Sequence, residues 1–259
     1  MFVTYKDIKL LRIMPITTIL FDMDSTLNTI DEMAFSQKYF ELLHMNYFQE
    51  FDLQYFSDTL TEITRNVMLS KNSKELTVNT FMKEMSRNFR KSPKKIYDKF
   101  KTYYANEYSK LQEYVKPAKF ARKAVQLSIQ KEYDVIIATT PIFTEHAIMQ
   151  RLSWSGVADF NYQLITHAEN MHSSKPREEY YLEIRKKIKR KSEECLMIGN
   201  EFLSDIVAPT KLGMKTFYCT INCDDDYFIS PELKRFSKIK PTYAGTLENY
   251  IQLITDGFE

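Results

Sequence analysis

Two aspartates separated by one residue, Asp22 and Asp24, follow a short apolar run near the start of this chain. The run over residues 16–21 is rich in β-branched residues, which predicts a buried strand ending just before Asp22. Residues i and i+2 of an extended segment point the same way, so both carboxylates can face one site. Two such charges repel unless a cation, a proton or a phosphate-handling site compensates them. The alternative for this segment alone is a strand followed by an ordinary Asp/Ser/Thr helix cap.

Four further apolar segments predict strands, and helical patterns lie between them. The strands are expected at residues 133–138, 162–166, 195–198 and 215–219. Helices are expected from Pro117, over 145–152, and from Pro176 to Lys191, the last with acids near its start and bases near its end. Such alternation predicts an α/β fold with a doubly wound parallel sheet.

The gap between the first two strands breaks this alternation. Residues 32–115 contain helical periodicities, including one that begins at Ser92-Pro93, and no convincing strand. We therefore predict a Rossmann-like core domain over residues 1–31 and 116–259, and an inserted, all-helical cap domain over 32–115.

Polar residues follow the other predicted strands. Thr139 and Thr140 follow the second strand, Lys175 comes after the third, and Glu201 and Asp205 come after the fourth. Parallel strands bring these residues to one edge of the sheet, where ligands bind in open α/β sheets. Carboxylates that outnumber bases favour a hard divalent cation such as Mg²⁺, with lysine and threonine orienting a phosphoryl group.

This ordered set resembles the haloacid dehalogenase-like hydrolase superfamily. The superfamily has a DxDx(T/V) motif, a strand ending in Thr or Ser, a lysine, and an acidic pair of the form GDxxxD or GNDxxxD. The matching residues are Asp22-Met23-Asp24-Ser25-Thr26, Thr139, Lys175 and Gly199-Asn200-Glu201-Phe202-Leu203-Ser204-Asp205. The insertion falls where the family carries its helical cap.

The resemblance implies a Mg²⁺-dependent phosphatase that hydrolyses a small phosphorylated metabolite. Asp22 would attack phosphorus to give an aspartyl-phosphate intermediate, and Asp24 would act as general acid and base. Thr139, Thr140 and Lys175 would bind the phosphoryl group. Members that are dehalogenases lack an acid at the position of Asp24, so its presence favours phosphate ester hydrolysis.

The resemblance also implies a magnesium site. This chain departs from the family pattern at three positions. The Asp22 carboxylate, the Asp24 backbone carbonyl and Glu201 would hold Mg²⁺, with Asp205 close by. Glu201 replaces the usual first Asp of the acidic pair, so its longer side chain can meet the metal through water. Ser25 stands where many members have Gly, and Thr140 replaces a common Asn.

Two other functions share the same core residues. One is a non-catalytic or regulatory protein that binds a phosphorylated ligand, which the Glu201 replacement favours. The other is a phosphomutase, which differs only in the chemistry of its cap. The identity of the substrate and the oligomeric state are not encoded in any recognisable pattern.

Composition excludes several other classes. The net charge is +2, which predicts no preference for nucleic acid or acidic membranes, and no apolar run reaches the length of a membrane span. Three cysteines without a CxxC pair predict reduced thiols in a cytoplasmic protein. A second possible start at Met14 makes residues 1–13 a possible peripheral extension.

Three other groups of polar residues have simpler interpretations. The basic run over residues 186–191 fits a solvated helix end, and Asp224-Asp225-Asp226 fits a solvated loop. The four histidines show no metal-ligand spacing, although His172 lies near Lys175 in the sequence. The aromatic rows of the insertion are expected to be mostly packing core, with a few residues free to line a pocket.

Overall fold

The computed structural model describes residues 15–71, 74–220, 236 and 238–258. The acidic run at residues 224–226 and the possible extension over residues 1–13 lie outside these ranges.

A six-stranded parallel sheet forms the centre of the molecule, in the order β5-β4-β1-β6-β7-β8. Its strands are β1 (Thr18–Phe21), β4 (Asp134–Ile137), β5 (Leu164–Ile165), β6 (Cys195–Gly199), β7 (Lys215–Cys219) and β8 (Tyr243–Gly245). The five predicted strands are therefore confirmed, while β8 at the sheet edge was not predicted. A parallel sheet of this kind fits the predicted Rossmann-like α/β fold.

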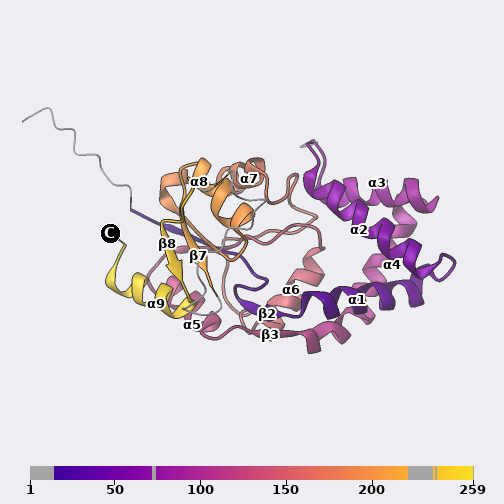
Figure 1. Cartoon of the computed structure of the whole chain (residues 1–259), viewed down its shortest axis with the longest axis horizontal. Coiled ribbons are helices and arrows are strands. Elements are labelled where there is room, and N and C mark those ends of the chain that lie inside the picture. Colours follow the sequence, from indigo (N-terminus) through magenta and orange to yellow (C-terminus); the bar gives the residue numbers. More distant parts are fainter. Residues whose placement is uncertain (1–14, 72–73, 221–235, 237, 259) are drawn as a thin grey trace, which may run out of the picture.

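Helices cover both faces of the sheet, and the side-chain alternation of the strands explains how. Ile19 and Phe21 of β1 pack toward α5 (Ala121–Gln130), α6 (Glu145–Trp154) and α9 (Leu247–Asp256). Leu20, between them, packs toward α7 (Glu178–Ile188) and α8 (Ala208–Lys211). Figure 1 shows α7 and α8 on one side of the sheet and α5 and α9 on the other.

Two predicted helix starts were wrong. Pro117 belongs to β3 (Val115–Pro117), which pairs antiparallel with β2 (Asn28–Ile30), and α5 begins only at Ala121. The helix expected from Pro176 begins at Glu178. In both cases proline, which is compatible with a first helical turn, instead occupies extended or irregular chain just before it.

Four helices lie between β2 and β3 and form a separate lobe in Figure 1. They are α1 (Glu32–Leu43), α2 (Leu53–Leu69), α3 (Thr77–Phe89) and α4 (Pro93–Asn106), with a π-helix at His44–Phe48 and a 3₁₀-helix at Tyr108–Tyr114. Phe56, Leu60, Ile63 and Val67 recur at helical spacing in α2 and are all buried, which agrees with the helical periodicity expected in this region. Ser92 caps α4 by accepting the N–H of Lys95. The division into a core domain and a cap domain stays a prediction.

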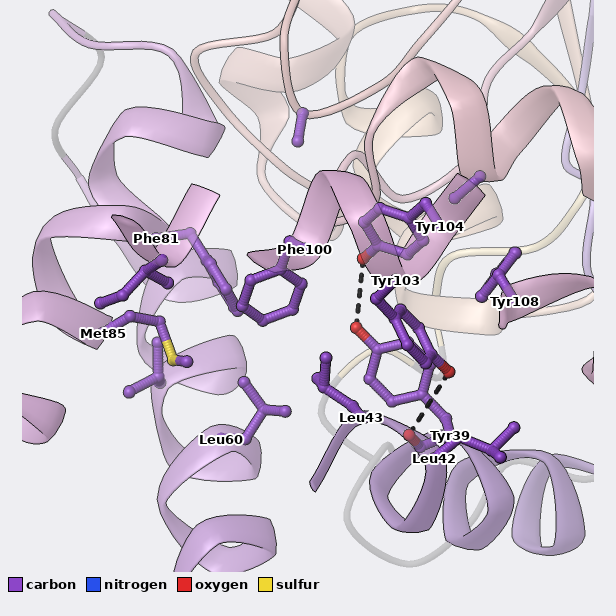
Figure 2. Close-up of a cluster of buried hydrophobic side chains, with 14 of the residues drawn as sticks. Tyr39, Leu42, Leu43, Leu60, Phe81, Met85, Phe100, Tyr103, Tyr104 and Tyr108 are labelled. Carbon is purple, nitrogen blue, oxygen red and sulfur yellow. Dashed lines mark hydrogen bonds between the residues drawn. The ribbon is translucent and has the colours of Figure 1, made fainter. Parts of the chain in front are cut away.

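Aromatic side chains fill the inside of this helical lobe. Figure 2 shows Tyr39 of α1 facing Tyr103 and Tyr104 of α4, with Tyr108 beyond them. The hydroxyls of Tyr39 and Tyr104 lie 3.1 Å apart and form a hydrogen bond, so they need no other partner in the apolar interior. The expected role of these aromatic rows as packing core is confirmed.

Candidate active site

Asp22 lies directly after β1, at the carboxyl edge of the sheet. Its backbone N–H donates to the carbonyl of Ile198 on β6, which continues the strand pairing as far as the aspartate itself. The chain then turns, and Leu27 and Asn28 both donate to the carbonyl of Met23. Ser25 sits in this turn with φ of 56°, a left-handed conformation that glycine adopts more readily. The family's frequent glycine at this position therefore has a conformational reason. Ser25 adopts the same backbone conformation although its Cβ atom makes it less favourable.

Lys175 connects two of the predicted site residues. Its ammonium nitrogen is 2.7 Å from Asp22 Oδ1 and 2.7 Å from Asp205 Oδ1. The lysine is only 1% exposed and Asp205 is equally buried. Lys175 thus joins Asp22, 153 positions earlier in the chain, and Asp205, 30 positions later, in one buried ionic cluster at the edge of the sheet where the sequence predicted it.

Burial controls the protonation of this cluster. It raises the pKa of Asp22 to about 7, with Lys175 opposing the shift and the carboxylates of Asp205 and Asp24 adding to it. Burial also raises the pKa of Asp205. Burial alone would lower the pKa of Lys175, but the charges of Asp205 and Asp22 hold it well above its usual value. We conclude that Lys175 stays charged and that the two acids compete for it.

Gly199 and the turn after β6 place Asp205. A Cβ atom at residue 199 would lie 2.2 Å from Asp205 Oδ2, so only glycine allows the carboxylate to lie against the strand. The same oxygen accepts the backbone N–H of Glu201 at 3.0 Å. The π-helix Phe202–Val207 carries Asp205 into this position.

Glu201 does not join the cluster. It is exposed, and its Oε2 atom accepts a hydrogen bond of 2.7 Å from the hydroxyl of Ser204. Within the part of the chain that the structure describes, no group of three or more His, Cys, Asp or Glu side chains is arranged to hold a metal ion. The predicted metal ligands Asp22 and Asp205 meet through Lys175, whereas Asp24 and Glu201 have other partners.

Asp24 has two partners that the sequence did not indicate. Its Oδ2 atom is paired with the guanidinium of Arg151, and its Oδ1 atom accepts a hydrogen bond of 3.1 Å from Asn28. Arg151 lies on α6 and is 4% exposed. One signal was available: Arg151 lies three and four residues after Ile148 and Ala147, on the apolar face of the helix. A charged residue at such a position requires a buried partner.

Two of the three predicted phosphate-binding residues, Thr139 and Thr140, lie just after β4, which pairs with β1. Thr139 is buried, and its carbonyl accepts hydrogen bonds from Thr166 Oγ1 (2.8 Å) and from the hydroxyl of Tyr180 (2.9 Å). These bonds fix the loop that carries Thr140, which is half-buried. His172, by contrast, pairs with Glu183 at 2.8 Å on α7.

Among the described residues, none of the helices is both long and apolar enough to cross a lipid bilayer.

Comparisons with known proteins agree with this architecture. Solved structures that cover nearly the whole chain include a HAD phosphatase from Thermococcus onnurineus, at 14% identity and a TM-score of 0.57 (93% of this chain, 99% of that chain). The magnesium-bound putative HAD-hydrolase YfnB from Bacillus subtilis matches at 22% identity and a TM-score of 0.54, covering 92% of this chain and 98% of that chain. An L-2-haloacid dehalogenase from Xanthobacter autotrophicus matches at 12% identity and a TM-score of 0.54, covering 93% of this chain and 98% of that chain. At these identities the likeness concerns the fold.

No curated protein matches the chain at a significant level. The family profile described as "haloacid dehalogenase-like hydrolase" matches residues 19–219, which span the sheet from β1 to β7 and every predicted site residue. This chain therefore belongs to the haloacid dehalogenase-like hydrolase family.

Proposed function

We propose that this protein is a Mg²⁺-dependent phosphatase that hydrolyses a small phosphorylated metabolite through an aspartyl-phosphate intermediate. The observation that carries the proposal is the buried Asp22 carboxylate, paired with Lys175 at 2.7 Å and followed two residues later by a second acid, Asp24. This arrangement offers a nucleophile, a fixed positive charge and a proton donor at one sheet edge.

The proposed reaction has two steps. Asp22 attacks phosphorus while the bond from phosphorus to the leaving oxygen breaks, and Asp24 gives its proton to that oxygen. Asp24 then takes a proton from water as the water attacks the aspartyl-phosphate, which releases inorganic phosphate and regenerates Asp22. Lys175 and Thr139 bind the phosphoryl oxygens in both steps.

The oxygen donors at this edge are of the chemical kind that a hard divalent cation prefers. Two buried carboxylates, Asp22 and Asp205, share one ammonium group, so the cluster carries an excess of negative charge when both are ionised. The Asp22 carboxylate and the Asp24 backbone carbonyl would hold Mg²⁺, with Asp205 beside them and Glu201 acting through water. Bound magnesium supplies positive charge that reduces repulsion between the substrate phosphate and these acids.

A pocket whose lining includes Phe35 and Phe143, the two rings beside Arg151, would favour a small and largely apolar leaving group. It has a volume of about 150 Å³ and lies between α1, α2 and the loop that follows Thr139. Phe35, Leu60 and Phe143 are among its lining residues. The hydroxyls of Tyr39 and Tyr104 in its wall bond to each other, and that of Thr64 donates to the carbonyl of Leu60. Ser36 is then the further hydroxyl of the lining that could bind a polar substrate group.

The family also contains dehalogenases, which are the main alternative. Phosphate esters are the favoured substrates because Asp24 can protonate an alkoxide leaving group, whereas a halide leaving group needs no proton. A phosphomutase or a phospho-ligand-binding protein would keep the same cluster. The cytoplasmic location predicted from the cysteines stays a prediction.

The decisive experiment measures phosphate release from 4-nitrophenyl phosphate and from a panel of metabolite phosphates with Mg²⁺. We expect turnover that EDTA abolishes, and a loss of about 10²-fold or more in Asp22→Asn. L-2-chloropropionate serves as the competing substrate, because release of chloride would favour the dehalogenase. Activity of more than a few per cent in Asp22→Asn would exclude the covalent role of Asp22.

A further inference from the structure

Arg151 is a buried cation outside the proposed phosphate-binding cluster. It projects from α6, outside the four sequence motifs, and its guanidinium pairs with Asp24. A guanidinium group stays protonated in proteins. Arg151 therefore presents a permanent positive charge to the proposed proton donor.

Aromatic rings hold the guanidinium in place. The guanidinium carbon of Arg151 lies 5.4 Å from the ring centroid of Phe35 and 5.1 Å from that of Phe143. Phe35 belongs to α1, the first helix after β2, and Phe143 belongs to the loop that begins with Thr139. Cation–π contacts in a desolvated setting restrict where the side chain can lie.

A second set of hydrogen bonds fixes Asp24 relative to the same helix. Asn28 donates to Asp24 Oδ1 and also lies within 3.1 Å of the Ser155 hydroxyl. Ser155 in turn donates to the carbonyl of Arg151 at 2.7 Å. The two carboxylate oxygens of Asp24 thus have separate donors, and both donors are tied to the end of α6.

The Arg151–Asp24 ion pair is better explained by orientation of the Asp24 carboxyl group than by stabilisation of the fold. Replacing a buried ion pair with apolar residues is often neutral or stabilising, so burial of Arg151 alone does not explain its presence. Its partner is partly exposed, with 28% of the Asp24 side chain accessible. A cation fixed on one oxygen of Asp24 restricts the orientation of its carboxyl group.

We propose that Arg151 is a positioning residue, which orients Asp24 for proton transfer to the leaving oxygen and stabilises the carboxylate that this transfer leaves behind. The inference rests on the proposed phosphatase function. In the step concerned, the proton moves from Asp24 to the leaving oxygen as the bond to phosphorus breaks, and Arg151 keeps its own protons.

The test compares two substrates of similar shape, phenyl phosphate and 4-nitrophenyl phosphate. The phenolate leaving group needs a proton far more than 4-nitrophenolate does. We expect Arg151→Met to lower kcat/KM for phenyl phosphate at least about tenfold more than for 4-nitrophenyl phosphate, since general acid catalysis contributes about 10²–10⁴-fold. Arg151→Lys, which keeps the charge without the planar fork, should recover part of the difference.

Two further variants separate orientation from folding. In Asp24→Asn/Arg151→Met, the loss on phenyl phosphate should not exceed that of Asp24→Asn alone, because both changes remove one function. Arg190 pairs with Asp134 at the amino end of β4, on the opposite edge of the sheet, so Arg190→Met is the matched control and should leave both rates unchanged. If Arg151→Met does not fold, the substrate comparison in Arg151→Lys decides.

Failure of the positioning role can be distinguished from failure of the proposed phosphatase function. If the wild-type protein hydrolyses neither ester with Mg²⁺, the phosphatase proposal fails and this inference fails with it. If the wild-type protein is active but Arg151→Met loses the same factor on both esters, only the positioning role is overturned.

Discussion

At the scale of single residues, the site is organised by two separate cations. Lys175 is shared between Asp22 and Asp205, and Arg151 is paired with Asp24. The two aspartates of the first motif therefore experience different surroundings although only one residue separates them. Different surroundings are the condition under which neighbouring carboxylates can take different chemical roles.

The role of Glu201 gives a prediction at this scale. In Glu201→Ala we expect the Mg²⁺ concentration for half-maximal phosphatase activity to rise about tenfold or more, as for other outer ligands of a metal site. Glu201→Asp should keep the wild-type requirement. Magnesium titrations of activity measure both, and Ser204→Ala is the control, because it removes only the 2.7 Å hydrogen bond to Glu201. An unchanged Mg²⁺ requirement in Glu201→Ala would mean that Asp205, and not Glu201, supports Mg²⁺ binding.

At the scale of elements, the turn between β6 and the following π-helix determines where the second acid lies. The buried strand ends at Gly199, and the chain reverses tightly enough for Asp205 to pack against that glycine. The acidic pair of the family pattern is thus split by local geometry: Asp205 points into the cluster and Glu201 faces solvent.

Gly199→Ala tests this turn. The added methyl group would overlap the Asp205 carboxylate, so we expect a loss of about 1–3 kcal/mol in unfolding free energy together with a large loss of phosphatase activity per folded molecule. Urea unfolding and initial rates measure the two effects. Gly213→Ala is the comparison: its φ of 83° makes alanine unfavourable, but it lies away from the site and should lower stability alone. Full activity in folded Gly199→Ala would mean that Asp205 need not lie against the strand.

At the scale of the whole molecule, patterns local in sequence were predictable and pairings between distant segments were not. Five strands and the site edge follow from apolar runs and the polar residues after them. The edge strand β8 has only three residues and carries no apolar pattern, and β2 and β3 pair with each other across the whole helical insertion. Asp24 finds Arg151 on a helix 127 residues away, which no local spacing encodes.

The helical lobe also contacts the segment that carries Lys175. The N-terminus of α3 has no side-chain cap, and the N–H groups of its first two residues donate instead to the loop between β5 and Lys175. Thr77 donates to the carbonyl of Met171 through both its N–H and its hydroxyl, each at 2.8 Å, and Val78 donates to Ala168 at 2.9 Å. Both acceptors lie in the loop between β5 and Lys175, so docking of α3 supports the loop that positions the lysine.

Thr77→Pro tests this connection. Proline is favoured at the first position of a helix and the preceding Leu76 is already extended, so α3 should persist while both bonds to Met171 are lost. We expect faster amide exchange over residues 166–175, a loss of about 1–2 kcal/mol in unfolding free energy, and a several-fold lower kcat/KM for 4-nitrophenyl phosphate. Thr77→Ser keeps both donors and should behave as wild type. Unchanged exchange and activity in Thr77→Pro would mean that Lys175 is held by its two carboxylates alone, without help from the helical lobe.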